Sequence, residues 1–528
     1  MRLLHIAGAM ATGLATIWFL GGVTAACAQA AGNDAAGRSW HFAGADIHNT
    51  RSAPDERRLG PEGASRLAPK WIFKAAGDLS ATPTVDHGVL YVPDWGGMLH
   101  GIDVKTGVPI WSRKVSEYTG NEKSLSRTSP AIGDRTIVFG DQGGATIIAV
   151  GKEKGDLVWK TVVDPLPGAW IASSPVIVGN RVYVGVSSNE EVLVATVPGY
   201  KLEFRGSIVA LDLETGAVVW RHYTVPEGYT GGAIVGGNLA IDEKRNSLYA
   251  GAGNNYSVPP DVTTCLKGKE TAEEQAACLD PLDHVDAVLS LDLTDGHLKW
   301  SARTEGFDTW TGSCRRNLPG CPDPVGPDYD FASAPNLFTT KRSAEHEPRD
   351  ILGIGQKSGI YWAFDPDNGS VIWATRVGPG GPLGGIEWGS AVDGDRIYVA
   401  IADVLHKPYK LSPSGQPWHS GSWAALDPAT GGILWQIPTM GNDPAHPKVG
   451  SLGIGSVSVA NGVMYAGTNA GDMAAIDGAT GKVLWQFASG GTVISGPAIV
   501  DGALYWGSGY SRFDGIPNNQ LYAFAVPE

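Results

Sequence analysis

The stretch that decides the fold is Ala210-Leu211-Asp212-Leu213-Glu214-Thr215-Gly216-Ala217-Val218-Val219-Trp220. An apolar strand leads into Asp-x-x-Thr-Gly, which forms a tight turn, and a second strand then carries the tryptophan, so the stretch indicates a β-hairpin. Gly216 suits the turn because glycine adopts positive φ angles without a steric cost. We expect the ring of Trp220 to cover the backbone of a neighbouring repeat while its indole N–H donates to a carbonyl there.

The spacing Asp-x-x-x-Gly-x-x-x-Trp recurs along the chain. The copies occupy residues 103–111, 212–220, 292–300, 365–373, 427–435 and 477–485, and a further copy that ends at Trp159 has Gly151 in place of the aspartate. Between these hairpins lies a second phrase, a small polar residue and proline followed by an apolar run and an aromatic strand, as in Ser174-Pro175 leading to Tyr183. Each repeat therefore holds about four strands, which is the content of one propeller blade.

An incomplete repeat at each end of the chain predicts a closed ring. Trp71 is an eighth docking tryptophan without its own upstream hairpin strand, and a matching strand occurs at residues 521–525. The sequence thus predicts an all-β, eight-bladed β-propeller with tryptophan-docking repeats, in which N- and C-terminal strands complete one blade and leave no sheet edge exposed. A linear solenoid or two β-sandwiches would have no use for half a repeat at each end.

Composition excludes several protein classes. The chain has 528 residues, with 72 Gly, 34 Pro and 18 Trp, and 43% of its residues are apolar, which argues against disorder. Its formal net charge of −14 argues against a nucleic-acid partner bound through a basic face. Length alone allows three or four domains, but the repeat reduces this estimate to a single ring.

The first thirty residues have the features of a signal peptide. Arg2 is their only charged residue, residues 6–23 are apolar, and Ala28-Gln29-Ala30 fits a cleavage site. The alternatives are an N-terminal membrane anchor and a lipoprotein site at Cys27, which Thr24 disfavours because such sites usually carry leucine there. We expect residues 1–30 to be a signal peptide and residues 31–528 to form the propeller, without a transmembrane segment in the mature chain, which would be periplasmic or secreted.

Cysteine usage agrees with export. Cys265, Cys278, Cys314 and Cys321 remain after the signal, and four cysteines allow three pairings. The local pairing, Cys265 with Cys278 and Cys314 with Cys321, closes two short loops. A zinc site is the alternative, but the chain has no Cys-x-x-Cys pair and no histidine at ligand spacing. We therefore expect disulfide bonds.

The docking phrase Ala-x-Asp-x-x-Thr-Gly-x-x-x-Trp, repeated around an eight-bladed ring, resembles the quinoprotein alcohol dehydrogenases that use pyrroloquinoline quinone (PQQ). The opening residues 40–44 and 49–51 are similar to the start of their mature domains. The resemblance implies PQQ and calcium as cofactors. The repeat alone also fits a non-catalytic propeller scaffold of the outer-membrane assembly type, so the choice depends on residues outside the repeat.

Two segments resemble the family's calcium ligands. Ser187-Ser188-Asn189-Glu190-Glu191 is similar to a strand-end Ser-Gly-Ala-Glu whose glutamate binds calcium, and Gly253-Asn254 is similar to a Gly-Asn-x-x-Pro whose asparagine is another ligand. The resemblance implies Glu190, Asn254 and Asp328 as metal ligands and places Ser188 beside the cofactor. Oxygen donors of this kind suit a hard cation. Taken singly, Glu190 is equally a solvated loop carboxylate and Asn254 a turn residue.

Pro327-Asp328-Tyr329-Asp330-Phe331 is similar to the family's Trp-Asp-Tyr-Asp, whose first aspartate is the catalytic base. The resemblance assigns this role to Asp328, with Asp330 as neighbour or rival; an aspartate turn that caps a strand is the alternative. A carboxylate is chemically suitable because the O–H proton of an alcohol must leave as hydride moves to the quinone. The metal would act as a Lewis acid on that quinone.

Three further cofactor contacts follow from the resemblance. Gln356-Lys357-Ser358-Gly359 resembles a strand-end Lys-Asn-Gly, so Lys357 would place a cation beside the quinone oxygens, where negative charge develops on reduction. Arg127 and Trp388 match family positions near the cofactor, and an arginine can hold a carboxylate of PQQ through two hydrogen bonds.

The chain also departs from the family. It has no adjacent cysteines, Val235 stands where many members have a tryptophan under PQQ, and no Cys-x-x-Cys-His attaches a haem. We expect electrons to pass to a separate cytochrome c or similar acceptor. Because Val235 replaces this tryptophan, a third possibility is a propeller that keeps a cofactor-like pocket but has lost catalytic turnover. The segments 187–191 and 328–335 are most like the polyvinyl alcohol dehydrogenase branch, which implies secondary alcohols, polymeric ones included, as substrates oxidised to ketones or aldehydes.

Overall fold

The computed structural model describes residues 39–236, 238–342 and 346–527. The expected signal peptide, residues 1–30, lies outside these ranges, as do the first residues of the expected propeller. Among the described residues, no helix is long and apolar enough to cross a membrane.

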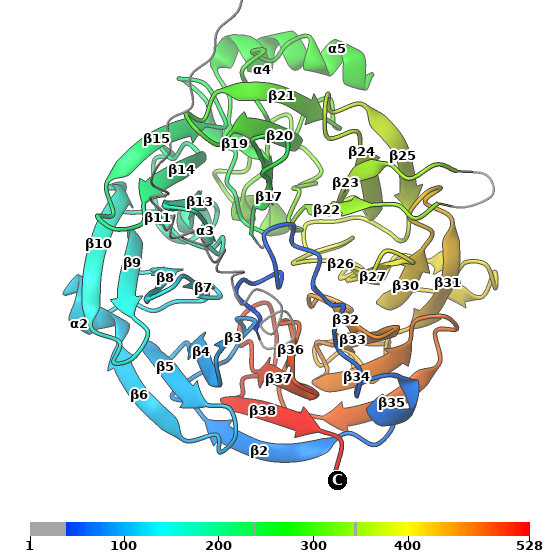
Figure 1. Ribbon diagram of the computed structural model, residues 1–528. Coiled ribbons are helices and arrows are strands. Elements are labelled where there is room, and N and C mark those ends of the chain that lie inside the picture. The colour runs from blue at the N-terminus through cyan, green and yellow to red at the C-terminus, as the bar shows by residue number, and fades with distance from the viewer. Residues whose placement is uncertain (1–38, 237, 343–345, 528) are drawn as a thin grey trace, which may run out of the picture. The chain divides into compact units, whose positions relative to one another are not determined.

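Antiparallel four-stranded sheets follow one another around a closed ring (Figure 1). Within the described ranges these sheets number eight, which confirms the predicted eight-bladed propeller. The blades of the first half are β3 (Thr84–Asp86), β4 (Val89–Pro93), β5 (Met98–Asp103) and β6 (Pro109–Lys114); β7 (Ala131–Ile132), β8 (Thr136–Gly140), β9 (Ala145–Gly151) and β10 (Leu157–Asp164); β12 (Val176–Val178), β13 (Arg181–Ser188), β14 (Ser207–Asp212) and β15 (Val218–Tyr223); and β17 (Ala240–Asp242), β18 (Ser247–Gly251), β20 (Ala287–Asp292) and β21 (Leu298–Arg303).

The second half of the ring repeats this arrangement. Its blades are β22 (Asn336–Thr339), β23 (Asp350–Gly355), β24 (Ile360–Phe364) and β25 (Val371–Arg376); β26 (Ala391–Val392), β27 (Ile397–Ile401), β30 (Ser422–Leu426) and β31 (Ile433–Pro438); β32 (Ser458–Ala460), β33 (Val463–Gly467), β34 (Asp472–Asp477) and β35 (Val483–Ala488); and β36 (Ala498–Val500), β37 (Ala503–Ser508), β38 (Gln520–Ala525) and β2 (Ala68–Lys74). A short strand, β1 (Ser52–Ala53), adds to β32 in parallel.

The ring closes where the first blade strand in the chain, β2, meets the last one, β38. β2 pairs with β38 in antiparallel register, with Trp71 opposite Ala523, and the two strands lie side by side in Figure 1. The C-terminal strand thus supplies the hairpin partner that the first repeat lacks in sequence, as predicted.

The docking tryptophans join each blade to the next. Trp220 on β15 donates its indole N–H to the carbonyl of Leu293 at 3.1 Å. The remaining acceptors, at 2.7–3.3 Å, are Val104 for Trp71, Lys152 for Trp111, Leu213 for Trp159, Pro366 for Trp300, Pro428 for Trp373, Gly478 for Trp435 and Leu67 for Trp485. The last of these connects the final repeat to the first, so this docking belt runs around the whole ring.

The glycine of the repeat is required by this docking. Gly216 has φ +71°, and a Cβ atom there would lie 2.5 Å from Cε3 of Trp159. Both the left-handed backbone and the close approach of the ring therefore favour glycine. This confirms the structural role predicted for the Asp-x-x-x-Gly-x-x-x-Trp repeat.

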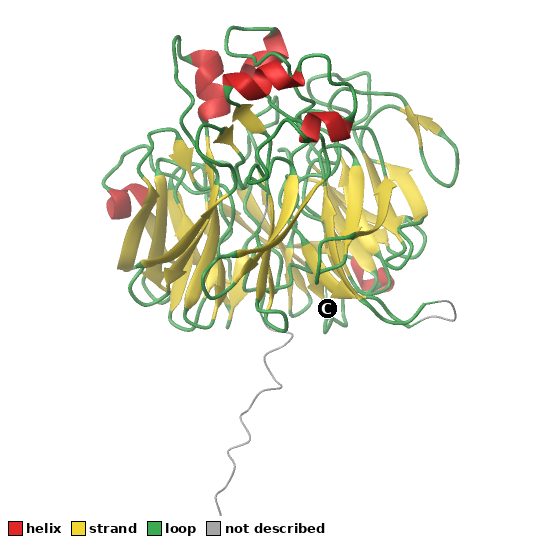
Figure 2. Cartoon of the chain, turned by 90° about the horizontal axis from the view of Figure 1, so that it is seen from above, coloured by secondary structure: helices red, strands yellow, loops and turns green. Residues whose placement is uncertain are grey.

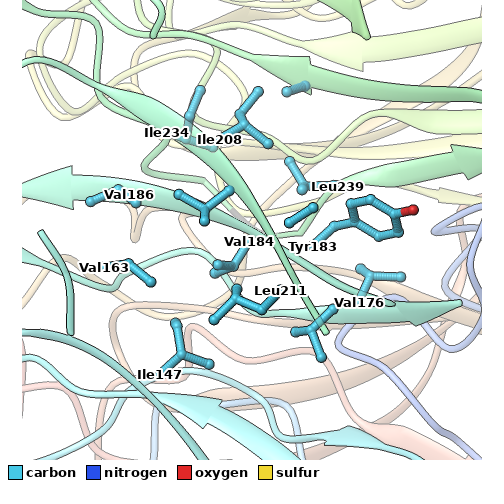
Figure 3. Close-up of a cluster of buried hydrophobic side chains, with 14 of the residues drawn as sticks. Ile147, Val163, Val176, Tyr183, Val184, Val186, Ile208, Leu211, Ile234 and Leu239 are labelled. Atoms are coloured by element: carbon cyan, nitrogen blue, oxygen red, sulfur yellow. The ribbon is translucent and has the colours of Figure 1, made fainter. Parts of the chain in front are cut away.

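Apolar side chains fill the spaces between blades. Val184 on β13 and Leu211 on β14 are fully buried and cluster with Ile147 of the preceding blade and Ile234 at the entry to the next (Figure 3). Each such side chain contributes about 1.5–3 kcal/mol by leaving water. The blades are thus held by burial on their faces and by the docking belt at their outer edge.

Segments outside the blade strands carry the helices and short accessory strands, and most of the helices gather on one face of the ring (Figure 2). These elements are α1 (Pro61–Ala64), α2 (Val115–Thr119), α3 (Glu190–Thr196), α4 (Pro260–Leu266), α5 (Ala272–Ala276), η1 (Gly312–Arg316), β11 (Ala169–Trp170), β16 (Thr230–Gly231), β19 (Asn255–Ser257), β28 (Tyr409–Lys410) and β29 (Pro417–Trp418). Disulfides join Cys265 to Cys278 and Cys314 to Cys321, which confirms the local pairing.

Candidate active site

The blade order brings the predicted site segments to one end of the ring. In an antiparallel blade the first strand begins where the second strand ends, so these two chain segments meet at the same face, which we call the mouth. The residues that precede first strands (β7, β17, β22 and β26) are Arg127, Val235, Asp328, Asp330 and Trp388. The residues that follow second strands (β13, β18 and β23) are Glu190, Glu191, Asn254 and Lys357.

A cavity of about 420 Å³ opens at the mouth. This size lies within the usual range for small-molecule and cofactor sites. The sequence-predicted residues that line it are Arg127, Ser188, Asp328, Asp330, Lys357 and Trp388, and Val235 lines it as well. Residues that are about 260 positions apart in sequence thus share one pocket.

Lys357 forms the centre of the charged cluster. Its Nζ donates to Oδ1 of Asp328 at 2.8 Å and to Oδ2 of Asp330 at 2.6 Å. Burial lowers the pKa of Lys357, but the two carboxylates outweigh this effect and raise the pKa well above its usual value. The ammonium group therefore stays charged inside the protein.

The two aspartates differ in the atoms they leave available. Asp330 accepts the backbone N–H of Asn254 through Oδ1 at 2.6 Å, so Lys357 and Asn254 occupy both of its oxygens. Within the described chain, Oδ2 of Asp328 accepts no hydrogen bond. Burial raises the pKa of Asp328, Lys357 opposes this, and the charges of Asp330 and Glu191 raise it further. Because one oxygen of Asp328 is unoccupied and both oxygens of Asp330 are occupied, Asp328 is the better placed proton acceptor of the two.

The backbone around Asp328 is held in an uncommon conformation. Asp328 has φ +60°, which is rare outside glycine. Asp308 fixes this turn because Oδ1 accepts the N–H of Asp328 at 3.1 Å and Oδ2 accepts that of Tyr329 at 2.7 Å. Burial raises the pKa of Asp308 to about 6. Sequence reasoning missed Asp308, which lies between repeats and belongs to no recurring phrase.

The structure separates Glu190 from its neighbour Glu191. The carboxylate of Glu190 faces away from the cavity and accepts the hydroxyl of Tyr200 at 3.1 Å and the N–H of Phe204 at 2.9 Å. Glu191 lines the cavity instead, and burial together with the charge of Asp330 raises its pKa to about 8. The side chains of consecutive residues in a helix point about 100° apart. Glu190 and Glu191 open α3, so when one of them faces the pocket the other faces away from it.

Asn254 lies beside the cavity without lining it. Its Nδ2 donates to the carbonyls of Asn255 at 2.9 Å and Trp310 at 2.8 Å, which fixes the orientation of the amide. Its Oδ1 accepts no hydrogen bond from the described residues and so remains available as an oxygen ligand.

Arginines and aromatic rings complete the pocket, and sequence reasoning missed most of them. The guanidinium carbon of Arg127 lies 4.6 Å from the ring centre of Trp388, and that of Arg512 lies 5.2 Å from Trp170. Arg315 lies 5.3 Å from the ring of Phe513. Arg512 follows the second strand β37 as Lys357 follows β23, so its position in the repeat was the signal that could have identified it.

Relatives of the chain include alcohol-oxidising enzymes. A polyvinylalcohol dehydrogenase from a Pseudomonas species is 29% identical over 451 residues, which cover 81% of this chain and 64% of that protein. The quinohemoprotein alcohol dehydrogenase ADH IIB from Pseudomonas putida is 23% identical over 67% of this chain and 49% of its own length. The match thus spans from about half to less than two-thirds of the length of these relatives.

Solved structures share the fold. The quinohemoprotein alcohol dehydrogenase from Comamonas testosteroni superposes with a TM-score of 0.69 at 20% identity, covering 93% of this chain and 82% of that one. BamB from Moraxella catarrhalis superposes with a TM-score of 0.51 at 14% identity, covering 87% and 97%. The sequence profile of the PQQ_2 family, described as outer membrane protein assembly factor BamB, matches residues 64–255 and 419–526. Because these matches cover more than half of the chain, the chain belongs to the PQQ_2 family.

Proposed function

We propose that this protein is a PQQ-dependent alcohol dehydrogenase that works with a bound hard cation in the mouth cavity. The observation that carries the proposal is the convergence of Lys357 with Asp328 and Asp330 in a buried pocket of about 420 Å³. A pocket of this kind offers a proton acceptor, a fixed positive charge and room for a flat cofactor together.

The lining fits PQQ, which is a flat quinone with three carboxylates. Arg127, Arg315 and Arg512 supply guanidinium groups for carboxylates, and the rings of Trp170 and Trp388 supply flat faces. Val235 packs on the pocket where many quinoproteins have a tryptophan, so we expect aromatic stacking from that side to be weaker.

The pocket also fits a hard cation such as calcium. Glu191 provides a carboxylate oxygen and Asn254 an amide oxygen, which are the donor types such ions prefer. We assign the metal-ligand role to Glu191 in place of Glu190, whose carboxylate is occupied by Tyr200 and Phe204. Burial and, to a smaller extent, the charge of Asp330 raise the pKa of Glu191 to about 8, and a bound cation would oppose both effects by favouring the charged carboxylate.

When bound, PQQ supplies a quinone that accepts hydride from the alcohol carbon, and the cation supplies Lewis-acid polarisation. The residues of this chain accept the hydroxyl proton of the alcohol and stabilise the charge that develops. Oδ2 of Asp328 is free to accept the hydroxyl proton of the substrate, because Lys357 binds the other oxygen, Oδ1. Lys357 keeps its positive charge beside the reacting centre, where it stabilises developing negative charge.

We assign secondary alcohols, polymeric ones included, to the substrate class because two relatives at 29% identity are polyvinylalcohol dehydrogenases. We assign the role of electron acceptor to a separate cytochrome c or similar carrier. Residues 1–30, acting as a signal peptide, would deliver the enzyme to the periplasm or outside the cell.

A non-catalytic scaffold is the second candidate, and the BamB description of the family profile favours it. The buried cluster of Lys357, Asp328 and Asp330 argues against it. Burying charges is costly, and a scaffold that binds through its blade edges has no need of them.

Reconstitution tests the proposal. Purified protein is titrated with PQQ in the presence of Ca²⁺, and dye reduction is then followed with a panel of primary alcohols, secondary alcohols and polyvinyl alcohol. We expect saturable binding and faster dye reduction with secondary alcohols. Absence of PQQ binding would reject the enzyme and favour the scaffold. Binding without dye reduction from any alcohol would indicate a pocket that has lost turnover.

A further inference from the structure

A group of metal-ligating side chains lies outside the cavity, on the blade formed by β26–β31. His406 follows the second strand β27, and Asp443 and His446 lie in the loop that follows the outer strand β31. β27 and β31 run in the same direction because each is antiparallel to β30, so their ends meet at the mouth face. Residues about forty positions apart are thereby brought together.

The three side chains present one ligand atom each to a common point. Nε2 of His406 lies 3.1 Å from Oδ2 of Asp443, and Nδ1 of His446 lies 3.2 Å from the same oxygen. All three ligand atoms lie within 4.8 Å of one another. Ligands at about 2.1 Å from one ion are separated by about 3.0–3.4 Å, so these distances match shared coordination.

The carboxylate of Asp443 is held in place from behind. Its Oδ1 accepts Nδ2 of Asn469 at 3.1 Å and the backbone N–H of Ala445 at 3.0 Å. These bonds turn Oδ2 toward the two imidazoles. Outer hydrogen bonds of this kind orient the carboxylates of metal sites.

We propose that His406, Asp443 and His446 form a second metal site, for a divalent transition-metal ion such as Zn²⁺. Two imidazoles and one carboxylate suit such ions better than calcium, which prefers oxygen ligands alone. The side chain of His446 is 63% exposed, so water completes the coordination from the solvent side. This ligand set separates the site from the all-oxygen donors of the mouth cavity.

The site is joined to one rim of the mouth cavity. Nζ of Lys407, next to His406, donates to the carbonyl of Gly380 at 2.8 Å, and the N–H of Ala402 donates to the carbonyl of Gly385 at 2.9 Å. Pro382 and Leu383, within the loop so held, line the cavity. A bound ion would therefore hold together the two loops that carry the ligands and support this rim.

Cobalt and zinc titrations test the site. Metal-free protein is titrated with Co²⁺, followed by the visible absorption of the ion and its displacement by Zn²⁺, and with Zn²⁺ by calorimetry. To keep the mouth cavity out of the measurement, all variants are made in an E191Q background. We expect one ion per chain, and at least about tenfold weaker binding in both His446→Gln and His406→Gln, since each removes one ligand.

His297→Gln is the matched control, because His297 forms a similar but exposed group with Asp292 and Asp295. We expect it to bind the ion as the E191Q parent does. The proposal is overturned if the parent binds no ion, or if His446→Gln and His406→Gln both bind it as tightly as the parent. Loss of binding in His297→Gln alone would place the ion in the exposed group and also overturn it.

Discussion

The docking belt and the mouth of the ring differ in the contacts that hold them: the belt repeats one neutral hydrogen bond, and the mouth contains buried charges. In the belt, a tryptophan such as Trp220 makes the same neutral hydrogen bond to the next blade at every repeat. At the mouth, Lys357 pairs with two buried aspartates in an arrangement that occurs in one blade junction. Repeated neutral contacts stabilise the ring, whereas buried charges cost solvation energy, so their presence at the mouth agrees with the proposed catalytic role. Substitutions in the belt should therefore change stability, and substitutions at the mouth should change ligand binding and rate.

The largest change in stability is expected from Trp220→Ala. The side chain is 7% exposed and seals the gap between two blades, so its removal should cost about 3–5 kcal/mol in the free energy of unfolding. Trp170→Ala is the control from the mouth, where the ring is half-buried and lines the cavity. Chemical denaturation should show the loss for Trp220→Ala only, and PQQ titration should show weakened binding for Trp170→Ala only. A stability loss in Trp170→Ala and weakened PQQ binding in Trp220→Ala would contradict the assignment of stability to the belt and ligand binding to the mouth.

The close approach of tryptophan to glycine in the belt is tested by Gly216→Ala. A left-handed alanine costs about 1–2 kcal/mol, and contact with Trp159 adds strain, for a total of about 2–4 kcal/mol. Gly415→Ala is a matched control because Gly415 has φ +72° with nothing within 4 Å of a new Cβ. Thermal unfolding should rank Gly216→Ala as clearly less stable than Gly415→Ala. Equal losses would show that docking adds nothing to the backbone effect.

A histidine pair beside the belt should make the ring sensitive to acid. Burial, with a smaller contribution from His222, lowers the pKa of His284 from 6.5 to about 4. The unfolded chain therefore binds a proton that the folded chain does not, and stability falls as pH drops from about 6.5 toward 4. Between about pH 7.5 and 5 the loss from His284 should be about 2 kcal/mol.

His284→Gln removes this titration. The difference in unfolding free energy between the two pH values should then be smaller in the variant than in the wild type. An unchanged difference would show that His284 does not contribute to the acid sensitivity.

The smallest effect is expected from Asp308→Asn, which acts on the mouth through the backbone. The amide can accept only one of the two N–H groups that Asp308 now accepts, so the turn that carries Asp328 loses one fixed bond. We expect about a tenfold lower kcat, or about 1.4 kcal/mol, with KM little changed. The pH profile of kcat should shift because the environment of Asp328 changes. A loss confined to KM would contradict a positioning role.

Sequence predicts the belt well because the same physical requirement recurs. Trp220 and Gly216 belong to the contacts between neighbouring blades, so the number of copies of their spacing predicts the number of blades. The incomplete repeat at each end of the chain predicts the pairing of β2 with β38. The segments that meet at the mouth follow or precede particular strands, so the order of strands in the repeat indicates which face they share.

What sequence did not supply was the direction of individual side chains in irregular segments. Glu190 and Glu191 are adjacent, and only the start of α3 decides that Glu191 lines the cavity. Arg315 lies on η1, which runs into the loop closed by the disulfide between Cys314 and Cys321, and such a loop has no periodic sequence pattern. Neither arrangement follows from spacing along the chain.

The most direct measurement of the central claim is the turnover of Asp328→Asn beside the wild type, both reconstituted with PQQ and Ca²⁺ and assayed with a secondary alcohol. Asparagine keeps the size of the side chain but cannot accept the hydroxyl proton. The account predicts PQQ binding in both proteins and a fall in kcat of about 10²–10⁴-fold in the variant. Equal kcat values in two proteins that both bind PQQ would contradict it.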